Sequence, residues 1–151
     1  MSVSDRAGRY SRFKPQKPHL MLPLVIMALL YWLSSIPGTP LPDDPQLYAL
    51  FYWLTPSIQN LLHIPAYAVL AVAWRWALSA WFDLSLTPSL MAGLIATGYG
   101  IFDEWHQSFV PGRYASLTDV MFNVAGVLLG LWLAARARRH TRAASSKILP
   151  P

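Results

Sequence analysis

The chain has 151 residues, of which 54% are hydrophobic and only 13% charged, and its formal net charge is +5. The length fits one domain, and the charged share is about half that of a soluble domain. The lack of cysteine excludes disulfides, thiolate metal sites and cysteine nucleophiles. The basic residues gather at the two ends of the chain, which favours anionic lipid headgroups over nucleic acid as their partner.

Four apolar segments approach the roughly 20 residues that a membrane-spanning helix needs. They cover residues 20–36, 58–80, 86–107 and 117–135. The sequence therefore predicts an all-α fold, a four-helix transmembrane bundle in residues 19–136. A basic cytoplasmic tail (1–18) precedes it, and a basic, disordered tail (137–151) follows. Because ten of the twelve Lys and Arg lie near the two ends, both termini are expected in the cytoplasm.

The first apolar segment and the loop after it allow more than one interpretation. A basic stretch, an apolar core and SSIPGTP also have the layout of a cleavable signal peptide. The core is long for such a peptide and no A-x-A-like site follows, which favours a retained helix. The proline-rich 37–57 loop is expected outside the membrane. Its second half, 47–54, would form a short amphipathic piece along the outer interface, as an anchor or as a lid.

Polar side chains occur at the outer ends of three predicted helices. Within each helix they are spaced about one turn apart and so share a face. The set comprises His63, Tyr67, Asp103, Glu104, Gln107, Asp119 and Asn123. Charged groups at the end of a spanning helix are costly unless they face protein or water. We therefore expect these side chains to converge beneath the outer surface.

The expected charges of this set do not balance. Three carboxylates are opposed only by Arg113, in the 108–116 loop. Because buried unpaired charge is costly, a carboxyl group stays protonated, His63 becomes protonated, or a cation binds. The first two outcomes provide acid and base partners, and the third a metal or substrate site. The plain alternative is a solvated helix end, in which Arg113 pairs with an acidic group and Asp119 stabilises a helix N-terminus.

The fourth segment also carries a packing signal. Gly126 and Gly130 have the G-x-x-x-G spacing that lets another helix approach closely. This spacing is compatible with packing inside the bundle and equally with a homo-oligomer.

The run FDEWHQSFVPGRYASLTDVMFNVAGVLLG resembles the signature of the VanZ-like family of small bacterial membrane proteins. The family's D-E-x-x-Q helix end, P-G-R turn and D-x-x-x-N-x-x-G helix start fall on residues 103–126, and its H-x-x-x-Y pattern on His63 and Tyr67. The family usually has an acidic–basic pair before the histidine, where this chain has Gln59 and Asn60. The resemblance implies a multi-pass protein of the bacterial cytoplasmic (inner) membrane. It also implies work at the outer face on envelope glycan or lipid-linked material, since the family is named for a glycopeptide (teicoplanin) resistance protein.

Two hypotheses of different class follow. In the first, the protein binds or modulates a cell-envelope component, with Arg113 pairing an anionic group and the carboxylates an amine. In the second, it is a membrane-embedded enzyme on a lipid-linked or glycan substrate, with acid and base roles for Asp103, Glu104 or His63. The expected substrate-binding residues are Arg113, Gln107, Tyr67, Asp119 and Asn123.

Two further hypotheses about the function involve ions. A metal-assisted enzyme would hold a hard cation through Asp103, Glu104 and Asp119, although the sequence assigns no metal ligand and no cofactor. A proton-coupled transporter is less well supported, because no acidic residue is expected deeper than the outer third of the membrane.

Overall fold

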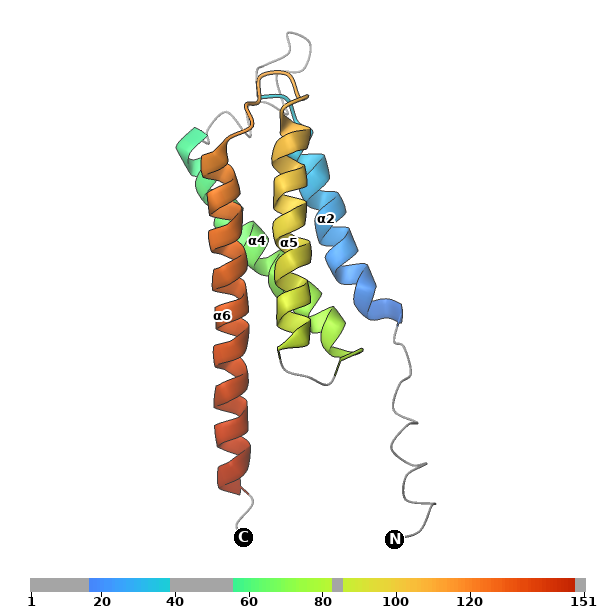
Figure 1. Cartoon of the computed structure of the whole chain (residues 1–151), viewed down its shortest axis with the longest axis vertical. Helices are drawn as coiled ribbons and strands as arrows, with labels where there is room; N and C mark the ends of the chain where they lie inside the picture. Colours follow the sequence, from blue (N-terminus) through green and yellow to red (C-terminus); the bar gives the residue numbers. More distant parts are fainter. Residues whose placement is uncertain (1–16, 39–55, 83–85, 149–151) are drawn as a thin grey trace, which may run out of the picture.

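The computed structural model describes residues 17–38, 56–82 and 86–148, and this part of the chain is all-helical, with no strand. A short 3-10 helix, η1 (Lys17–Leu20), leads into α2 (Met21–Ser34), and α4 (Pro56–Ser79), α5 (Thr87–Gln107) and α6 (Leu117–Ile148) follow. The four longer helices alternate in direction: α2 and α5 run upwards in Figure 1, whereas α4 and α6 run downwards. The all-α prediction is confirmed for these residues.

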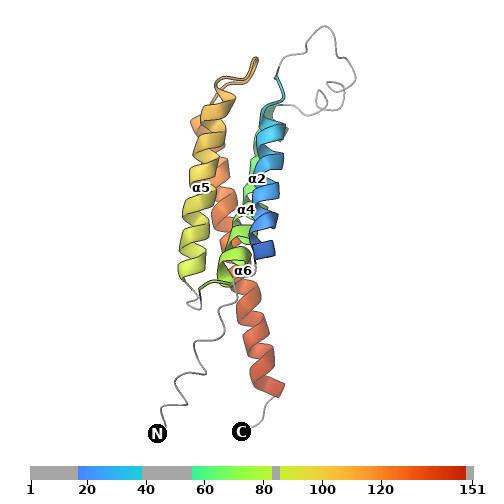
Figure 2. The same cartoon turned by 90° about the vertical axis from the view of Figure 1, so that its right-hand side faces the viewer.

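The helices begin and end close to the predicted apolar segments, except at the C-terminal end of α6. That helix continues to Ile148, so the expectation of a disordered tail is wrong for residues 137–148. Their sequence, ARRHTRAASSKI, is rich in alanine and arginine, which favour helix even where no apolar face is buried. Figure 2 shows α6 extending well beyond the other helices. The predicted amphipathic piece at 47–54 lies outside the described residues.

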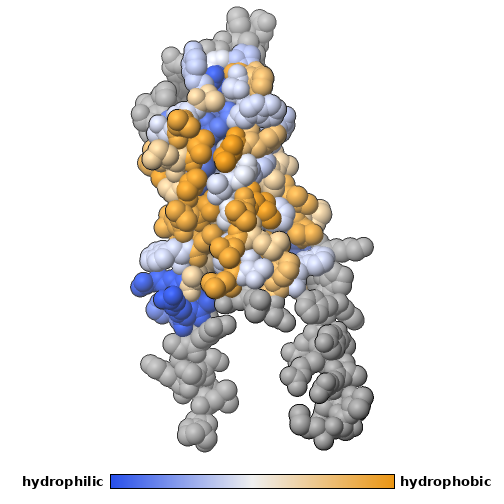
Figure 3. Space-filling model, viewed as in Figure 1, coloured by the Kyte–Doolittle hydropathy of each residue, from blue (hydrophilic) through white to orange (hydrophobic). Residues whose placement is uncertain are grey.

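Two helices are long and apolar enough to cross a membrane, over Asn60–Ser79 and Leu117–His140. Only 39% and 28% of these windows are buried, so they are unlike the core helix of a soluble protein. Within the described residues, α2 is apolar but shorter, with 14 residues. The hydropathy of α5 is lowered by three glycines and by its polar end, DEWHQ. Figure 3 shows an apolar band across the middle of the visible face, between more hydrophilic ends.

The closest helix approach is between α4 and α6, at the predicted glycine pair. A methyl group at Gly126 would overlap the carbonyl group of Ile64, and one at Gly130 would overlap that of Ala68. The two helices therefore meet backbone to backbone. The core beside this contact is formed by Tyr67, Leu70, Ala71, Ala96 and Val127. The glycine face is used for packing inside the bundle.

Candidate functional site

Polar side chains from three helices meet where α5 ends and α6 begins, beside the first turns of α4. We call this set the polar cluster: His63 and Tyr67 from α4, Asp103, Glu104 and Gln107 from α5, and Asp119 and Asn123 from α6. Six of its members are buried, and His63 is partly exposed. The structure thus brings together all seven helix residues that the sequence singled out.

Asp103 is held by two hydrogen bonds to the same carboxylate oxygen. The Tyr67 hydroxyl donates to Oδ2 at 3.1 Å, and the Gln107 side-chain amide donates to it at 3.3 Å. The other oxygen, Oδ1, is buried and no described group donates to it. Asp103 is only 3% exposed, so this oxygen lacks both protein donors and open solvent. The carboxylate is fixed on one side and available on the other.

His63 is held by Asn123, and a second bond fixes its tautomer. Asn123 Nδ2 donates to the Gly100 carbonyl at 3.3 Å, which turns Asn123 Oδ1 towards His63 Nδ1, 2.7 Å away. Because a carbonyl oxygen only accepts, Nδ1 is the protonated nitrogen of the neutral ring. Nε2 then carries a free lone pair. A side chain at Gly100 would crowd Asn123, with a Cβ 3.0 Å from Asn123 Cβ.

Glu104 shows the same one-sided arrangement, and Asp119 lies near it. The Ser116 main-chain amide donates to Glu104 Oε2 at 3.2 Å, while Oε1 is buried without a partner. Asp119 Oδ1 is also buried without a partner. Glu104 and Asp119 lie near enough for their charges to interact, and His63 is close to both. Three carboxylates therefore each keep one buried, unsatisfied oxygen, where most buried polar atoms in proteins have a partner.

Arg113 does not pair with these carboxylates. Its Nε donates to the Ile36 carbonyl at 3.0 Å and its Nη2 to the Leu33 carbonyl at 3.4 Å, both at the end of α2. Gly38 N–H donates to the Pro111 carbonyl at 3.0 Å, so the 108–116 loop is tied to α2 at several points. Burial lowers the pKa of Arg113, and the three carboxylates act in the opposite direction. The carboxylates of the polar cluster therefore form no contact ion pair with Arg113.

Sequence reasoning missed two contributors to this region, Gly100 and Ser116, and gave Gly112 of the P-G-R turn no conformational role. Gly100 gives Asn123 room, and its spacing three and four residues before the carboxylates was the available signal. Gly112 has φ of 74°, the left-handed conformation that glycine adopts easily in the P-G-R turn. Ser116 acts through its main-chain amide, for which no side-chain signal exists. His106, adjacent in sequence to the cluster, instead contacts Ser34 and Tyr31 of α2.

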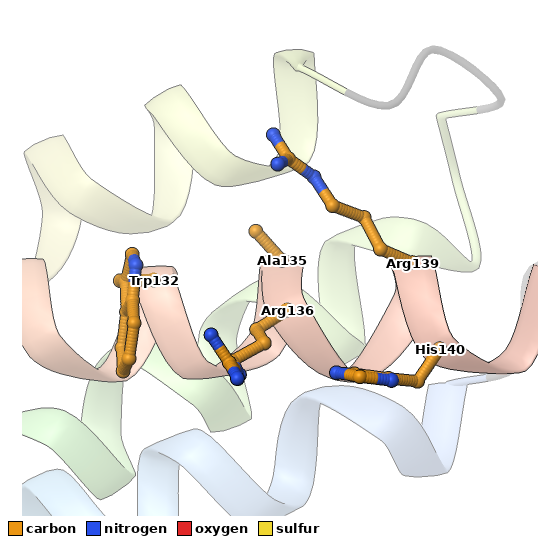
Figure 4. A pocket seen from close by; sticks show the side chains of 5 residues that line it. All are labelled: Trp132, Ala135, Arg136, Arg139 and His140. Atoms are coloured by element: carbon orange, nitrogen blue, oxygen red, sulfur yellow. The ribbon is translucent and has the colours of Figure 1, made fainter.

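A hollow lies along the C-terminal part of α6, away from the polar cluster, and we call it the basic hollow (Figure 4). It is lined by Trp132, Ala135, Arg136, Arg139 and His140. The Arg136 guanidinium lies over the Trp132 ring, 5.6 Å from its centroid. The three charged or titratable side chains are exposed and come from one helix. This arrangement suits loosely bound anions better than chemistry that needs fixed geometry.

Three residues of the polar cluster lie at distances that suit the ligands of one metal ion. One ring nitrogen of His63 and one carboxylate oxygen each of Asp103 and Glu104 lie within 4.8 Å of one another. Histidine nitrogen and carboxylate oxygen are both ordinary ligands of divalent metals. The sequence suggested Asp103, Glu104 and Asp119 as possible cation ligands, whereas the distances favour His63 in place of Asp119.

Comparison with known proteins gives one match. The family model described as VanZ/LLP1 matches residues 10–138, which is most of the chain. No curated protein and no solved structure matches the chain. The residues that resemble the family's signature are those that form the polar cluster and the loop beside it. On this match over most of its length, the chain belongs to the VanZ/LLP1 family.

Proposed function

We propose that this protein is a multi-pass protein of the bacterial cytoplasmic membrane whose polar cluster binds a lipid-linked or glycan component of the cell envelope. One observation carries the proposal: three buried carboxylates each present an oxygen that no described group satisfies. Such groups are expensive to bury and persist where a ligand completes them. Their position at the end of an apolar bundle supports a ligand that approaches from the membrane surface.

The charges at the opposite end support an outward orientation of the polar cluster. The helices alternate, so α2 begins and α6 ends at the end opposite to the cluster. Arg136, Arg138 and Arg139 lie there, near the end of the apolar part of α6. Cytoplasmic segments are enriched in Lys and Arg, which supports a cytoplasmic location for this end and an outer-face location for the polar cluster.

The chemistry of the cluster suggests which groups the ligand carries. Three carboxylates with unsatisfied oxygens favour a cationic group or several hydrogen-bond donors, such as an amine or sugar hydroxyls. Arg113 lies near enough to feel their charges, and its Nη1, which bonds to no described residue, could pair with a phosphate or carboxylate. Lipid-linked envelope intermediates combine these two kinds of group. The proposed binding mode uses both.

A second candidate function, a membrane-embedded enzyme, is favoured by the geometry of His63. Its ring is oriented by Asn123 through Nδ1, which leaves Nε2 available to accept a proton. A general base held in one tautomer beside carboxylates is a common arrangement for acid–base catalysis. In this version Asp103 or Glu104 would serve as the partner acid, and Tyr67 and Gln107 would position the Asp103 carboxylate.

The test is to identify lipids and lipid-linked molecules that remain bound to the purified protein, by mass spectrometry. The wild type is compared with Asp103→Asn and Glu104→Gln, and with His106→Gln as a matched control that changes a polar residue on the same helix end. We expect the two carboxylate variants to lose a ligand that the wild type and the control retain. If all four proteins carry the same molecules, the binding proposal is wrong.

The enzyme version is separated by adding the captured molecule back to the protein. His63→Gln should then still bind this molecule but no longer convert it. If the wild type binds the molecule but does not convert it over a long incubation, the enzyme hypothesis is wrong and only the binding function remains.

A further inference from the structure

We infer that the polar cluster is a divalent metal site, with His63 Nε2, Asp103 and Glu104 as the protein ligands of one transition-metal ion. The inference deepens the proposed function and rests on the same site, because it names what satisfies the carboxylates before a ligand arrives. It replaces Asp119, expected as a cation ligand from the sequence, by a histidine nitrogen. Three features of these residues support a metal site.

The first feature is distance. The potential ligand atoms of His63, Asp103 and Glu104 all lie within 4.8 Å of one another. Atoms that bind one metal at about 2.1 Å lie roughly 3–4.2 Å apart, so side-chain adjustments of about 1 Å would bring them to coordinating distance. The residues come from two helices, α4 and α5, packed against each other along the core. The ligand positions are thus set by the fold and not by a mobile loop.

The second feature is that each ligand residue already has one side-chain atom held by a hydrogen bond. Asp103 Oδ2 accepts from Tyr67 and Gln107, Glu104 Oε2 accepts from the Ser116 amide, and His63 Nδ1 donates to Asn123. The other nitrogen or oxygen atom of each side chain has no hydrogen-bond partner among the described residues. Metal ligands in proteins characteristically have such outer hydrogen bonds, which fix the tautomer of histidine and the orientation of carboxylates.

The third feature is the unsatisfied oxygens. Asp103 Oδ1 and Glu104 Oε1 are buried with no donor, in side chains that are 3% and 4% exposed. A solvated acidic patch would not show this, because water would satisfy both atoms. Three carboxylates opposed by one arginine also leave about two negative charges, which a divalent ion would neutralise.

The donor set indicates the class of metal. One imidazole with two carboxylates is intermediate between the nitrogen-rich sites of zinc and the all-oxygen sites of magnesium or calcium. Zn²⁺ and Mn²⁺ both accept this set. Three protein ligands leave coordination positions open for water or for an oxygen of the bound headgroup. Asp119, with its own free oxygen nearby, would accept a hydrogen bond from such a water.

The experiment is a metal titration of the full chain, purified in detergent without a polyhistidine tag and stripped with a chelator. Zn²⁺ is added alone, without lipid, and the ion retained after gel filtration is measured by elemental mass spectrometry. We expect one Zn²⁺ per chain. His63→Gln and Glu104→Gln should lose it, and Asn123→Ala should weaken binding by about 10- to 100-fold, as for other outer-sphere partners. His106→Gln should bind as the wild type does.

A spectroscopic measurement on the wild type guards against variants that fail to fold. Mn²⁺ bound to the stripped protein should show a directly coordinated histidine nitrogen by pulsed electron paramagnetic resonance, and ¹⁵N-histidine labelling should change that signal. Less than stoichiometric ion in the wild type, or equal Zn²⁺ affinity in a helical His63→Gln variant, overturns the metal site. Because no lipid is present, either result leaves the lipid-capture test of the proposed function standing on its own.

Discussion

The two charged ends of the molecule are built in opposite ways. At the polar cluster, side chains from three helices meet, six of the seven are buried, and hydrogen bonds hold Asp103, Glu104 and His63. At the basic hollow, all five lining residues come from α6 and its charged groups are exposed. The number of charges is similar, but only the first end fixes its charges in space. The comparison teaches that the number of charges does not by itself make a binding site. The side chains must also come together from several helices and be held by hydrogen bonds.

The largest expected effect comes from breaking the convergence itself. Gly126→Ala places a methyl group on the Ile64 carbonyl and forces α6 away from α4. Overpacking of this kind lowers the free energy of unfolding by about 1–3 kcal/mol. The polar cluster should be disturbed with it, since Asn123 lies one turn away. Thermal unfolding in detergent measures the loss.

Gly98→Ala is the matched control for that substitution. A methyl group at Gly98 meets no atom within 4 Å, so helix propensity alone should stabilise the protein by up to about 1 kcal/mol. Opposite signs at these two glycines are the expected result. Equal destabilisation would show that the α4–α6 approach is not what holds the cluster together.

A local effect of similar size is expected from loosening a single carboxylate. Tyr67→Phe removes a hydrogen bond to Asp103, and bonds to charged groups contribute about 1.5–3 kcal/mol. Tyr99→Phe is the comparison, because its hydroxyl donates to the neutral Met27 carbonyl at 2.6 Å and a neutral bond contributes about 0.5–1.5 kcal/mol. Chemical denaturation of both variants gives the difference. A larger loss at Tyr99 would argue that Asp103 is not ionised.

The positions of the helices could be predicted from the sequence because apolar runs and their polar borders are local properties. The predicted segment 58–80 and α4, Pro56–Ser79, differ by at most two residues at each end. Pairs on one face also follow from helix geometry, as for Asp103 and Gln107, which are hydrogen-bonded across one turn. The family signature pointed to the same residues.

The partners across helices could not be predicted, because they depend on how one helix is rotated against another. Asn123 meets His63 because Gly126 lets α6 approach Ile64, and the G-x-x-x-G spacing predicts a close approach without saying which helix makes it. Arg113 was expected near an acidic group, but it donates to carbonyls at the end of α2, whose position the loop sequence does not reveal. The length of α6 was missed because helix propensity continues where the apolar pattern stops.

Arg113 allows a test of the loop at the cluster end with a modest expected effect. Arg113→Lys keeps the charge but loses the planar fork that reaches Ile36 and Leu33, at a cost of about 1 kcal/mol. Hydrogen exchange at Gly38 N–H, which donates to Pro111, should become faster. Arg136→Lys is the control and should leave that exchange unchanged. Unchanged exchange in Arg113→Lys would mean that the arginine does not hold the loop to α2.

The smallest effect on stability is expected at the basic hollow. Arg136 and Arg139 are exposed, and surface substitutions away from buried networks change stability by about 0.5 kcal/mol or less. Their effect should instead appear in anionic lipid retained by the protein, measured by native mass spectrometry. Each arginine near an anionic surface contributes about 1 kcal/mol, so each alanine substitution should weaken retention by roughly fivefold.

Salt provides the contrast that separates the two ends. Exposed charges are screened within about 8 Å at physiological ionic strength, whereas buried groups are screened much less. Raising the salt concentration should therefore abolish the difference in lipid retention between the wild type and Arg136→Ala. Ligand capture that depends on Asp103 should survive the same change, because that carboxylate is 3% exposed. If salt acts equally on both, the cluster is no more enclosed than the hollow, and the distinction between a fixed site and an attracting surface is lost.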